Sequence, residues 1–381
     1  MVDAIIIGSG FAGSVMAEQL SRQNKKVLVL ESRDHIGGNC YDVKDEHGVL
    51  IHQYGPHIFH TNSEEVYTYL SQFTKWYDYS HEVAAFIDGE YMPVPFNLNT
   101  LKMVYGEAKA DLLGKKLLDE YGEGTRVPIL KLKENSDPDI AAIADYVYNN
   151  VFLKYTMKQW GQKPEEIDPS VTARVPVLIS YDNRYFQDKY QGMPLDGYTP
   201  VFEKMLKHPN IEVKLNTDAR DVLTFDDHGV KYEGSYFKGD IIYTGPIDEL
   251  FNCELGRLPY RTLDFVFEYH DTSSYQPKAV VNYTVSEEYT RITEYKKLTG
   301  QNISGTTTMK EYPRSYTGKD GEIPYYAISN DENQALYKQY VDKVSGYENV
   351  HLLGRLAEYK YYNMDGIVYM ALQLAEKLNN I

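Results

Sequence analysis

Alternating stretches of apolar and polar residues give the first indication of how this chain folds. The apolar run 4–7 has the length of a buried strand, and a second such run follows at 27–30. Between them, Val15, Met16 and Leu20 recur at helical spacing. The first forty residues therefore predict a strand, a helix and a second strand that together form a β-α-β unit.

The rest of the chain divides by its periodicity into helical and strand-rich parts. A hairpin is expected at 82–94, where Asp88-Gly89 supplies a turn with positive φ. Strong alternation at 263–268 indicates an antiparallel sheet, whereas the apolar run 240–246 is typical of a central parallel strand. Helices are predicted after a cap at Asn62, at 98–105, 107–121, 138–153, 154–160, 331–344, between Thr199 and Pro209, and from Met364; further strands are predicted at 49–53, 211–215, 221–225, 229–233, 279–284, 290–295, 306–312 and 350–353.

A Gly-x-Gly-x-x-Gly motif joins the first strand to the first helix. Gly8 permits the tight turn, Gly10 lets the backbone approach a pyrophosphate, and Gly13 lets helix and sheet pack closely. Glu31 ends the second strand, at the position where an acid accepts a ribose hydroxyl. A glycine-rich turn without a ligand is the alternative, but the strands, helix and acid in register favour a dinucleotide site.

The residues after Glu31 favour FAD over NAD, because NAD enzymes of this fold normally continue into a third strand and helix. Here a basic residue and then Gly37-Gly38 follow, as in flavoproteins of the glutathione-reductase-like superfamily, in which this loop wraps the FAD. The cofactor contacts expected from this part of the chain are Gly8, Gly10, Phe11, Ala12, Gly13, Glu31, Ser32, Arg33, Gly38 and Asn39.

The composition of the chain limits which classes of partner it is expected to bind. The net charge of −16 over 381 residues argues against nucleic acid, because phosphate binding needs a basic face, although a local cationic pocket stays possible. Only Cys40 and Cys253 are cysteines, so no disulfide framework is indicated and a reduced cytoplasm fits. The first apolar run is too short for a signal peptide or a membrane span, so no membrane insertion is expected.

Histidines and tyrosines mark the candidate chemistry. His57 and His60 lack a third ligand at metal-like spacing, so no metal is expected; His57 either contacts the flavin or merely bonds backbone. The 36 tyrosines outnumber phenylalanine and tryptophan together. Aromatic planes beside isolated arginines suit a nucleoside diphosphate, whereas a surface ion pair is the alternative for each arginine. Such groups concentrate at 155–160, Arg174, 183–186, 282–291, 325–326 and 361–363.

Several of these runs together resemble the bacterial UDP-galactopyranose mutase family, and the match extends in order over essentially the whole chain. The resemblance implies a cytoplasmic, usually homodimeric isomerase that interconverts UDP-galactopyranose and UDP-galactofuranose without net oxidation. It also implies a covalent sugar adduct at N5 of reduced FAD, and a helical and a six-stranded sheet domain beside the FAD domain. The runs that carry it are 54–61, 155–160, 182–186, 190–194 and 354–356.

The resemblance also implies roles for individual residues. Arg174 and Arg291 would bind the diphosphate and, with His57, form the catalytic set. Val222, Arg355 and Met364 would join His57 on the FAD. The substrate would contact Phe152, Tyr155, Thr156, Trp160, Arg174, Tyr185, Asn282, Arg291, Tyr326, Tyr361 and Asn363. There are two departures: Val151 stands where the family often has phenylalanine, with the phenyl ring at Phe152, and Asn363 stands where an aspartate is often found.

The predicted fold is α/β with α+β parts, built on a Rossmann-type FAD-binding domain. We assign 1–80, 205–250 and 325–381 to the FAD domain, 98–175 to an inserted helical domain, and 81–97, 176–204 and 251–324 to an antiparallel sheet domain that binds substrate. An FAD-dependent amine or carotenoid-type oxidoreductase remains the alternative function, because its cofactor domain has the same pattern.

Overall fold

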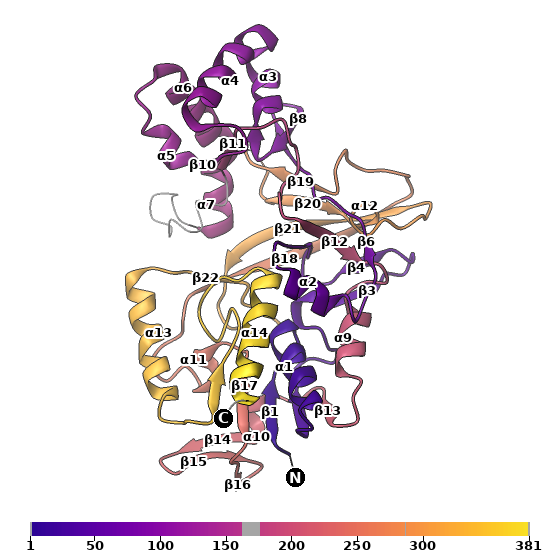
Figure 1. The fold of residues 1–381 in the computed structure, drawn as a ribbon, viewed down its shortest axis with the longest axis vertical. Coiled ribbons are helices and arrows are strands. Elements are labelled where there is room, and N and C mark those ends of the chain that lie inside the picture. Colours follow the sequence, from indigo (N-terminus) through magenta and orange to yellow (C-terminus); the bar gives the residue numbers. More distant parts are fainter. Residues whose placement is uncertain (1, 162–175, 286, 380–381) are drawn as a thin grey trace.

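The structure is a computed structural model that describes residues 2–161, 176–285 and 287–379 (Figure 1). A parallel five-stranded sheet forms its lower part, in the order β13-β2-β1-β17-β23. The strands are β1 Ala4–Ile7, β2 Val27–Leu30, β13 Ile211–Lys214, β17 Asp240–Tyr243 and β23 Val350–Leu352. The predicted Rossmann-type fold is thereby confirmed at its centre.

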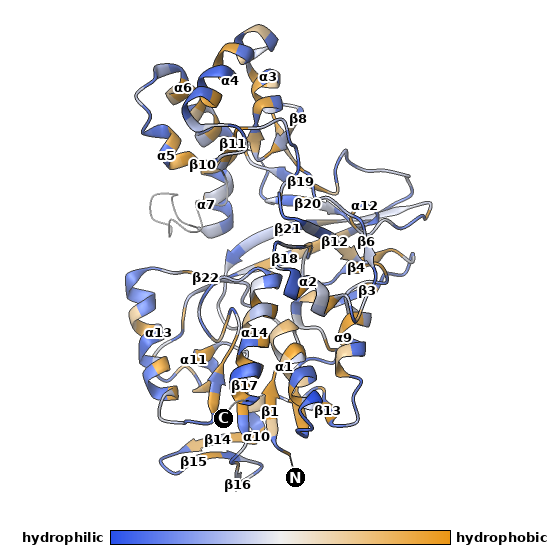
Figure 2. Ribbon diagram, viewed as in Figure 1, coloured by the Kyte–Doolittle hydropathy of each residue, from blue (hydrophilic) through white to orange (hydrophobic). Residues whose placement is uncertain are grey.

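Helices cover both faces of this sheet, which explains why β1 and β2 are apolar at every position. Ile6 packs toward α1 and its neighbours, while Ile5 packs into a separate cluster on the other face. Figure 2 shows the resulting apolar centre around β1 and β17. The helices are α1 Phe11–Arg22, α9 Thr199–Leu206, α10 Ala219–Val222, α11 Ile247–Leu250, α13 Asp331–Val344 and α14 Met364–Asn379.

A seven-stranded sheet lies above, in the order β22-β18-β21-β20-β19-β7-β8. It has one strand more than the resemblance implied, and it is mixed, because β7 and β19 pair in parallel. Pro93 lies inside β8, the edge strand, where its missing N–H costs no ladder bond. The strands are β7 Val83–Ile87, β8 Glu90–Val94, β18 Tyr260–His270, β19 Val280–Tyr283, β20 Arg291–Glu294, β21 Thr306–Ser315 and β22 Tyr326–Ala327.

A helical region stands at the top of Figure 1 and has its own apolar core. Its last predicted helices, 138–153 and 154–160, run on as one: α6 passes through a π-helical turn at 148–153 into α7. The helices are α3 Leu98–Tyr105, α4 Glu107–Tyr121, α5 Ile129–Lys133, α6 Pro138–Val147 and α7 Lys154–Trp160, and a small sheet contains β9 Phe96–Asn97, β10 Arg126–Pro128 and β11 Pro176–Leu178.

Shorter elements connect these parts. They are the 3-10 turn Gly38–Cys40, β3 Asp42–Lys44, β4 Leu50–His52, β5 Phe59–Thr61, α2 Glu64–Leu70, β6 Trp76–Tyr77, β12 Tyr190–Pro194, β14 Leu223–Asp226, β15 Gly229–Tyr232, β16 Ser235–Tyr236 and α12 Tyr295–Thr299. Two predicted starts were wrong. Ser63, not Asn62, caps α2, since its hydroxyl accepts from the Val66 N–H. The predicted strand 221–225 begins as α10, because the Asp218 carboxylate caps a helical turn there.

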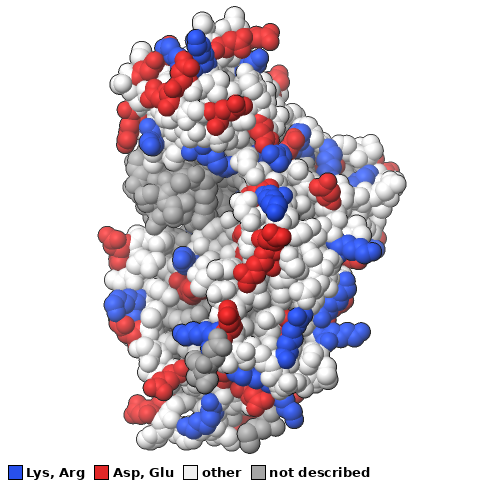
Figure 3. All heavy atoms as spheres, viewed as in Figure 1, with Lys and Arg blue, Asp and Glu red and all other residues white. Residues whose placement is uncertain are grey.

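The surface shows no simple charge pattern on the face drawn in Figure 3, where lysine and arginine side chains are interspersed with acidic ones. Within the described ranges, no helix is both long and apolar enough to cross a membrane.

Candidate active site

One cavity of about 1420 Å³ runs from the glycine loop of the parallel sheet to the seven-stranded sheet and α7. Ligand pockets usually hold roughly 300–1,000 Å³, so this cavity offers room for a dinucleotide and a second ligand. Its lining includes Gly10 at the start of α1, Tyr155 on α7 and Arg291 on β20. The cofactor and substrate sites predicted from distant parts of the sequence therefore open into the same space.

The loop between β1 and α1 has the backbone path that a bound pyrophosphate requires. Gly8 has a φ of +95°, and a Cβ there would lie 2.2 Å from the Thr244 hydroxyl oxygen. A Cβ on Gly13 would lie 1.9 Å from the Gly8 carbonyl oxygen, so only glycine lets α1 start this close to β1. No side chain caps the first turn of α1, where Phe11 and Ala12 line the cavity. The first amides of the helix are thus left for an anion.

Glu31 and Arg33 extend this cradle. One Glu31 oxygen accepts from the Ser9 N–H at 2.9 Å and the Ser9 hydroxyl at 2.6 Å, and the other accepts from the Arg33 N–H at 3.0 Å. The Ser32 hydroxyl donates to the same oxygen as Arg33 at 3.4 Å, a long bond that a ribose hydroxyl could replace on Glu31. Arg33 donates to Asn39 at 2.8 Å, but its Nη1 is buried without a partner in the described part of the chain. Such an unpaired donor indicates a ligand, and this donor set fits FAD.

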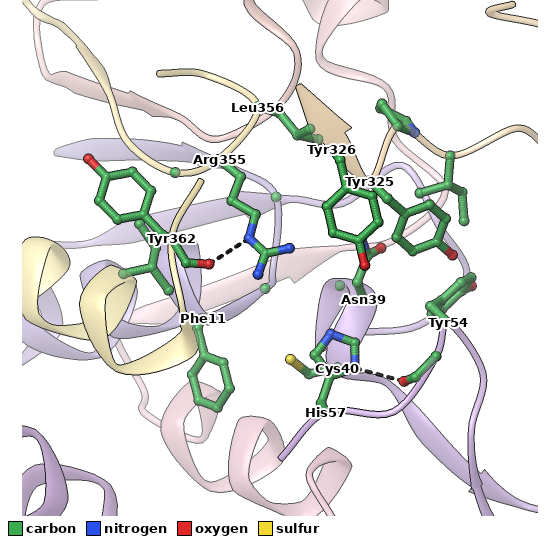
Figure 4. A pocket seen from close by; sticks show the side chains of 18 of the residues that line it. Phe11, Asn39, Cys40, Tyr54, His57, Tyr325, Tyr326, Arg355, Leu356 and Tyr362 are labelled. Carbon is green, nitrogen blue, oxygen red and sulfur yellow. Dashed lines mark hydrogen bonds between the residues drawn. The ribbon is translucent and has the colours of Figure 1, made fainter. Parts of the chain in front are cut away.

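His57 reaches the cavity as a neutral acceptor. Its Nδ1 lies 2.8 Å from the Gly55 carbonyl oxygen, which only accepts, so Nδ1 carries the proton and Nε2 has the lone pair (Figure 4). Burial, together with the nearby imidazole of His52, lowers the pKa of His57 to about 3. The His57 N–H also donates to Nδ1 of His52 at 3.0 Å, which fixes the loop that carries it.

Aromatic rings and one guanidinium line the opposite wall. Arg355 donates to the Tyr362 carbonyl oxygen at 2.7 Å, and its Cζ lies 4.4 Å from the centre of the Tyr361 ring. Tyr361 stacks on Tyr326 at 6.4 Å, and Tyr326 contacts Trp160 at 5.4 Å. Figure 4 shows the side chains of Arg355 and Tyr326 next to each other, both extending toward the side of the cavity that holds Cys40 and His57. These contacts orient a cation and two phenol groups for an anionic ligand.

Three polar side chains form a row across adjacent strands of the seven-stranded sheet. Asn282 on β19 lies directly opposite Arg291 on β20, which in turn lies opposite Glu311 on β21. Directly opposite residues share one face of a sheet, so the three side chains enter the cavity together. Arg291 Nε lies 3.1 Å from Glu311 Oε2, close enough for an ion pair but not aligned as a hydrogen bond.

This row retains unused hydrogen-bonding capacity. Asn282 Oδ1, Arg291 Nε and Glu311 Oε1 are buried and have no hydrogen-bond partner among the described residues. Burial alone would lower the pKa of Arg291, but Glu311 and nearby tyrosines outweigh it and raise that pKa. Burial raises the pKa of Glu311, and Arg291 opposes the rise. Three unsatisfied atoms in one buried row indicate that a polar ligand completes the site.

Most residues predicted for the site line the cavity. They are Gly8, Gly10, Phe11, Ala12, Glu31, Ser32, Arg33, Gly38, Asn39, His57, Tyr155, Tyr185, Asn282, Arg291, Tyr326, Arg355, Tyr361, Asn363 and Met364. Gly13, Val222, Phe152, Thr156 and Trp160 are not part of the lining. Gly13 acts through the packing of α1, and Trp160 touches Tyr326. Arg174 lies outside the described residues.

Phe152 is the predicted contact that differs most from expectation. Its side chain is 1% exposed and packs into the core of the helical region beside Tyr148. The π-helical turn at 148–153 sets this direction, and Val151 is buried as well. Neither side chain is placed to stack on a base in the cavity.

Glu311 and His81 are among the lining residues that sequence reasoning missed. His81 is 4% exposed and bonds the Tyr79 hydroxyl at 3.0 Å; burial, with Arg291 nearby, lowers its pKa to about 3. The signal for Glu311 was a lone acid at 306–312 among threonines, but only the pairing with β20 shows that it meets Arg291. No pattern in the sequence pointed to His81.

Known mutases have sequences similar to that of this chain, and the similarity extends over nearly its whole length. A sequence model of UDP-galactopyranose mutase matches residues 150–361, and one of the NAD(P)-binding Rossmann-like domain matches 6–73. A dTDP-fucopyranose mutase of Escherichia coli is 35% identical over 99% of this chain and 98% of its own. A UDP-galactopyranose mutase of Mycoplasma genitalium is 36% identical over 99% and 94%.

The fold agrees with these relatives. A crystal structure of reduced UDP-galactopyranose mutase superposes with a TM-score of 0.74 over 100% of this chain and 94% of that one, at 13% identity. The predicted cofactor and reaction class are also confirmed: the protein is an isomerase that uses FAD. Full-length mutase relatives and a family model over more than half of the chain show that it belongs to the UDP-galactopyranose mutase family.

Proposed function

We propose that this enzyme interconverts UDP-galactopyranose and UDP-galactofuranose with FAD in its reduced form. The observation that carries the proposal is the row Asn282–Arg291–Glu311, whose buried atoms lack partners and whose cavity continues to the glycine loop. A cofactor bound by the glycine loop and a nucleotide-sugar bound by the row would therefore meet inside one cavity.

The residues present would divide the work as follows. Gly10, Glu31 and Arg33 would hold the FAD diphosphate and ribose, and Arg355 and Met364 would reach the flavin. Tyr155 would stack on the uracil. Arg291, with Arg174, would bind the substrate diphosphate, helped by Tyr185, Tyr326 and Tyr361. When bound, reduced FAD supplies the electron-rich centre that the ring contraction needs.

The protein's own contribution is electrostatic. Charge accumulates on the diphosphate as its bond to the sugar C1 breaks, and the partly buried Arg291 guanidinium, paired with the buried Glu311, would stabilise that charge from the cavity wall. His57, neutral and fixed by Gly55, would offer an acceptor to the flavin without adding charge. Asn282 Oδ1 would accept a sugar hydroxyl, which satisfies its unpaired atom.

An anaerobic assay tests the proposal. The enzyme is reduced with dithionite, incubated with UDP-galactofuranose, and the mixture is analysed for UDP-galactopyranose; the oxidised enzyme is the matched control. Conversion by the reduced form alone is the expected result. No conversion in either state would show that UDP-galactofuranose is not the substrate, and oxygen consumption with an amine substrate would contradict the proposed reaction.

A second nucleotide-sugar belongs in the same assay. The Escherichia coli relative, a dTDP-fucopyranose mutase, matches this chain over as much of its length as the UDP-galactopyranose mutases do. The alternative substrate is therefore dTDP-fucopyranose, and the ratio of the two kcat/KM values decides between them.

We also propose that the enzyme is a cytoplasmic homodimer. Family membership supports the dimer, and two free cysteines, Cys40 and Cys253, are compatible with a reducing compartment. Sedimentation equilibrium of the FAD-loaded protein at micromolar concentration tests the dimer; a monomer there would contradict it.

A further inference from the structure

Helix α7, which carries Tyr155, is attached to the seven-stranded sheet by a lysine that binds only carbonyl groups. Lys158 Nζ donates to the carbonyl oxygen of Tyr283, to that of Glu287 at 3.0 Å and to that of Tyr289 at 3.3 Å. The first acceptor is the last residue of β19, and the other two belong to the connection between β19 and β20. One ammonium group thus uses its three donors to hold this connection against the helix.

A second cation holds the other end of α7. Arg261 on β18 donates to the Gln159 carbonyl oxygen at 3.0 Å, to that of Lys158 at 3.0 Å and to the Ser315 hydroxyl at 3.2 Å. It is 6% exposed, and a Cβ on Gly161, which has a φ of +71°, would lie 2.9 Å from its Nη1. The guanidinium therefore satisfies carbonyls that the helix end leaves unpaired.

Neither cation has a carboxylate partner within 4.0 Å among the described residues, so their role is distinct from ordinary surface pairing. Charged donors to backbone acceptors hold position without a flexible partner side chain. A further bond supports the same contact, because the Thr284 hydroxyl donates to the Asn150 carbonyl oxygen at 2.6 Å. Figure 1 shows α7 at the lower edge of the helical region, facing this sheet.

The connection held by Lys158 is flanked at both ends by residues of the candidate active site. Asn282 precedes the first acceptor, Tyr283, on β19, and Arg291 is the first residue of β20 after the connection. On the helix, Tyr155 lies three residues before Lys158, a spacing that places both on neighbouring positions of one face. The geometry points to Lys158, supported by Arg261, as a positioning residue that sets the separation between Tyr155 and the Asn282–Arg291 pair.

This inference rests on the proposed function, since that separation matters only if one ligand spans both ends. A nucleoside diphosphate sugar has such a length: its base would lie at Tyr155 and its diphosphate at Arg291. If Lys158 is replaced, Tyr155 and Arg291 are still present, but the distance between them is no longer fixed. Ground-state binding then weakens more than the chemical step.

The protonation state of Lys158 offers a second test of its contact with the three carbonyl groups. Burial lowers the pKa of Lys158 to about 8; Lys154 on the same helix lowers it further, and Glu287 on the connection raises it. Arg261, which stays charged, contacts the backbone carbonyl of Lys158 from β18. Above pH 8 the neutral amine has only two donors for three carbonyls, so the attachment weakens at alkaline pH.

Lys158→Met tests the inference, with Lys154→Met as the matched control because Lys154 is an exposed lysine on the same helix. In Lys158→Met we expect KM for UDP-galactofuranose to rise about tenfold, equivalent to about 1.4 kcal/mol, while kcat stays within about threefold. The unaltered enzyme should show KM rising between pH 7 and about 9.5, and the variant should lose that rise. The control should keep the low KM, and its KM should still rise with pH, but at higher pH, because Lys154 no longer lowers the pKa of Lys158.

Hydrogen exchange separates this inference from the proposed function. In the FAD-loaded protein without substrate, Lys158→Met should speed exchange of the amides in α7 and 287–291, and Lys154→Met should not. If the unaltered enzyme converts no UDP-galactofuranose, the proposed function is wrong. Hydrogen exchange and the affinity for UDP then still test whether Lys158 holds α7 to the β19–β20 connection. Unchanged exchange, an unchanged KM, or a pH-dependent KM that persists in Lys158→Met would overturn it.

Discussion

The pair Arg291–Glu311 offers the sharpest test of how the site is built. The Glu311 side chain is 2% exposed, Arg291 lies 3.1 Å away, and Oε1 of Glu311 has no partner in the described ranges. Replacing Arg291 with methionine leaves a buried carboxylate without its cation. Breaking a buried pair in this way costs about 3–5 kcal/mol. Because the Arg291 side chain is 24% exposed, we expect the free energy of unfolding to fall by about 3 kcal/mol, the lower end of this range.

A double variant separates stability from activity. Arg291→Met should lower kcat/KM by about 10²–10³, as expected for one lost charge-stabilising contact. In Arg291→Met/Glu311→Gln the buried charge is also gone, so most of the stability should return while the activity stays low. The measurements are urea unfolding of the FAD-loaded proteins and kcat/KM for UDP-galactofuranose under dithionite.

The pH dependence gives an independent check. An unfolded glutamate titrates near pH 4.3, burial raises the folded pKa of Glu311, and removing Arg291 removes the effect that opposes this rise. A raised folded pKa favours the protonated state, so stability is lost as the pH increases through it. Arg291→Met should therefore be closest to the unaltered protein at pH 5 and furthest from it at pH 8. Equal stability of the single and double variants at pH 8, or recovered activity in the double variant, would refute the reasoning.

Three further predictions concern the cofactor loop and the cavity walls. Gly13→Ala should purify with little flavin absorbance, because the new Cβ would overlap the Gly8 carbonyl oxygen; a normal FAD content would contradict this. Tyr155→Ala should raise KM about tenfold or more, whereas Tyr155→Phe, which keeps the stacking ring, should change it little; equal effects would exclude stacking. His57→Asn should leave the shape of the kcat/KM profile between pH 5 and 8 unchanged, because the pKa of His57 lies near 3. A titration that disappears in this variant would show otherwise.

Elements with a clear period were predictable from the sequence. The helices 107–121 and 331–344 and the strands around the glycine motif appear at the predicted residues, since a 3.6-residue or continuous apolar pattern records which faces are buried. The strand 126–128 and the helix 129–133 were not predicted, because each is too short to establish a period. Their structure comes from tertiary packing instead.

The site was only partly predictable for a different reason. Gly8, Gly13 and Glu31 could be found because their spacing along one β-α-β unit is fixed by local geometry. Arg291 and Glu311 belong to two strands whose register no local pattern specifies, so their contact could not be read from the sequence. Phe152 was predicted to contact the substrate but lies in the core. It belongs to a π-helical turn, in which side chains do not follow the regular helical spacing.

The strand order of the parallel sheet has a consequence for how the protein is made. β1 lies between β2 and β17, and β23 and α14 complete the layer from the far end of the sequence. At roughly 5–20 residues per second, β1 leaves the ribosome at least ten seconds or so before β17 can pair with it. Arg355 and Met364 are synthesised later still, so a growing chain has the glycine loop but not the complete FAD-binding site. Flavin loading is then a late step of biogenesis, and slower, cooler expression with riboflavin in supply favours a fully yellow product.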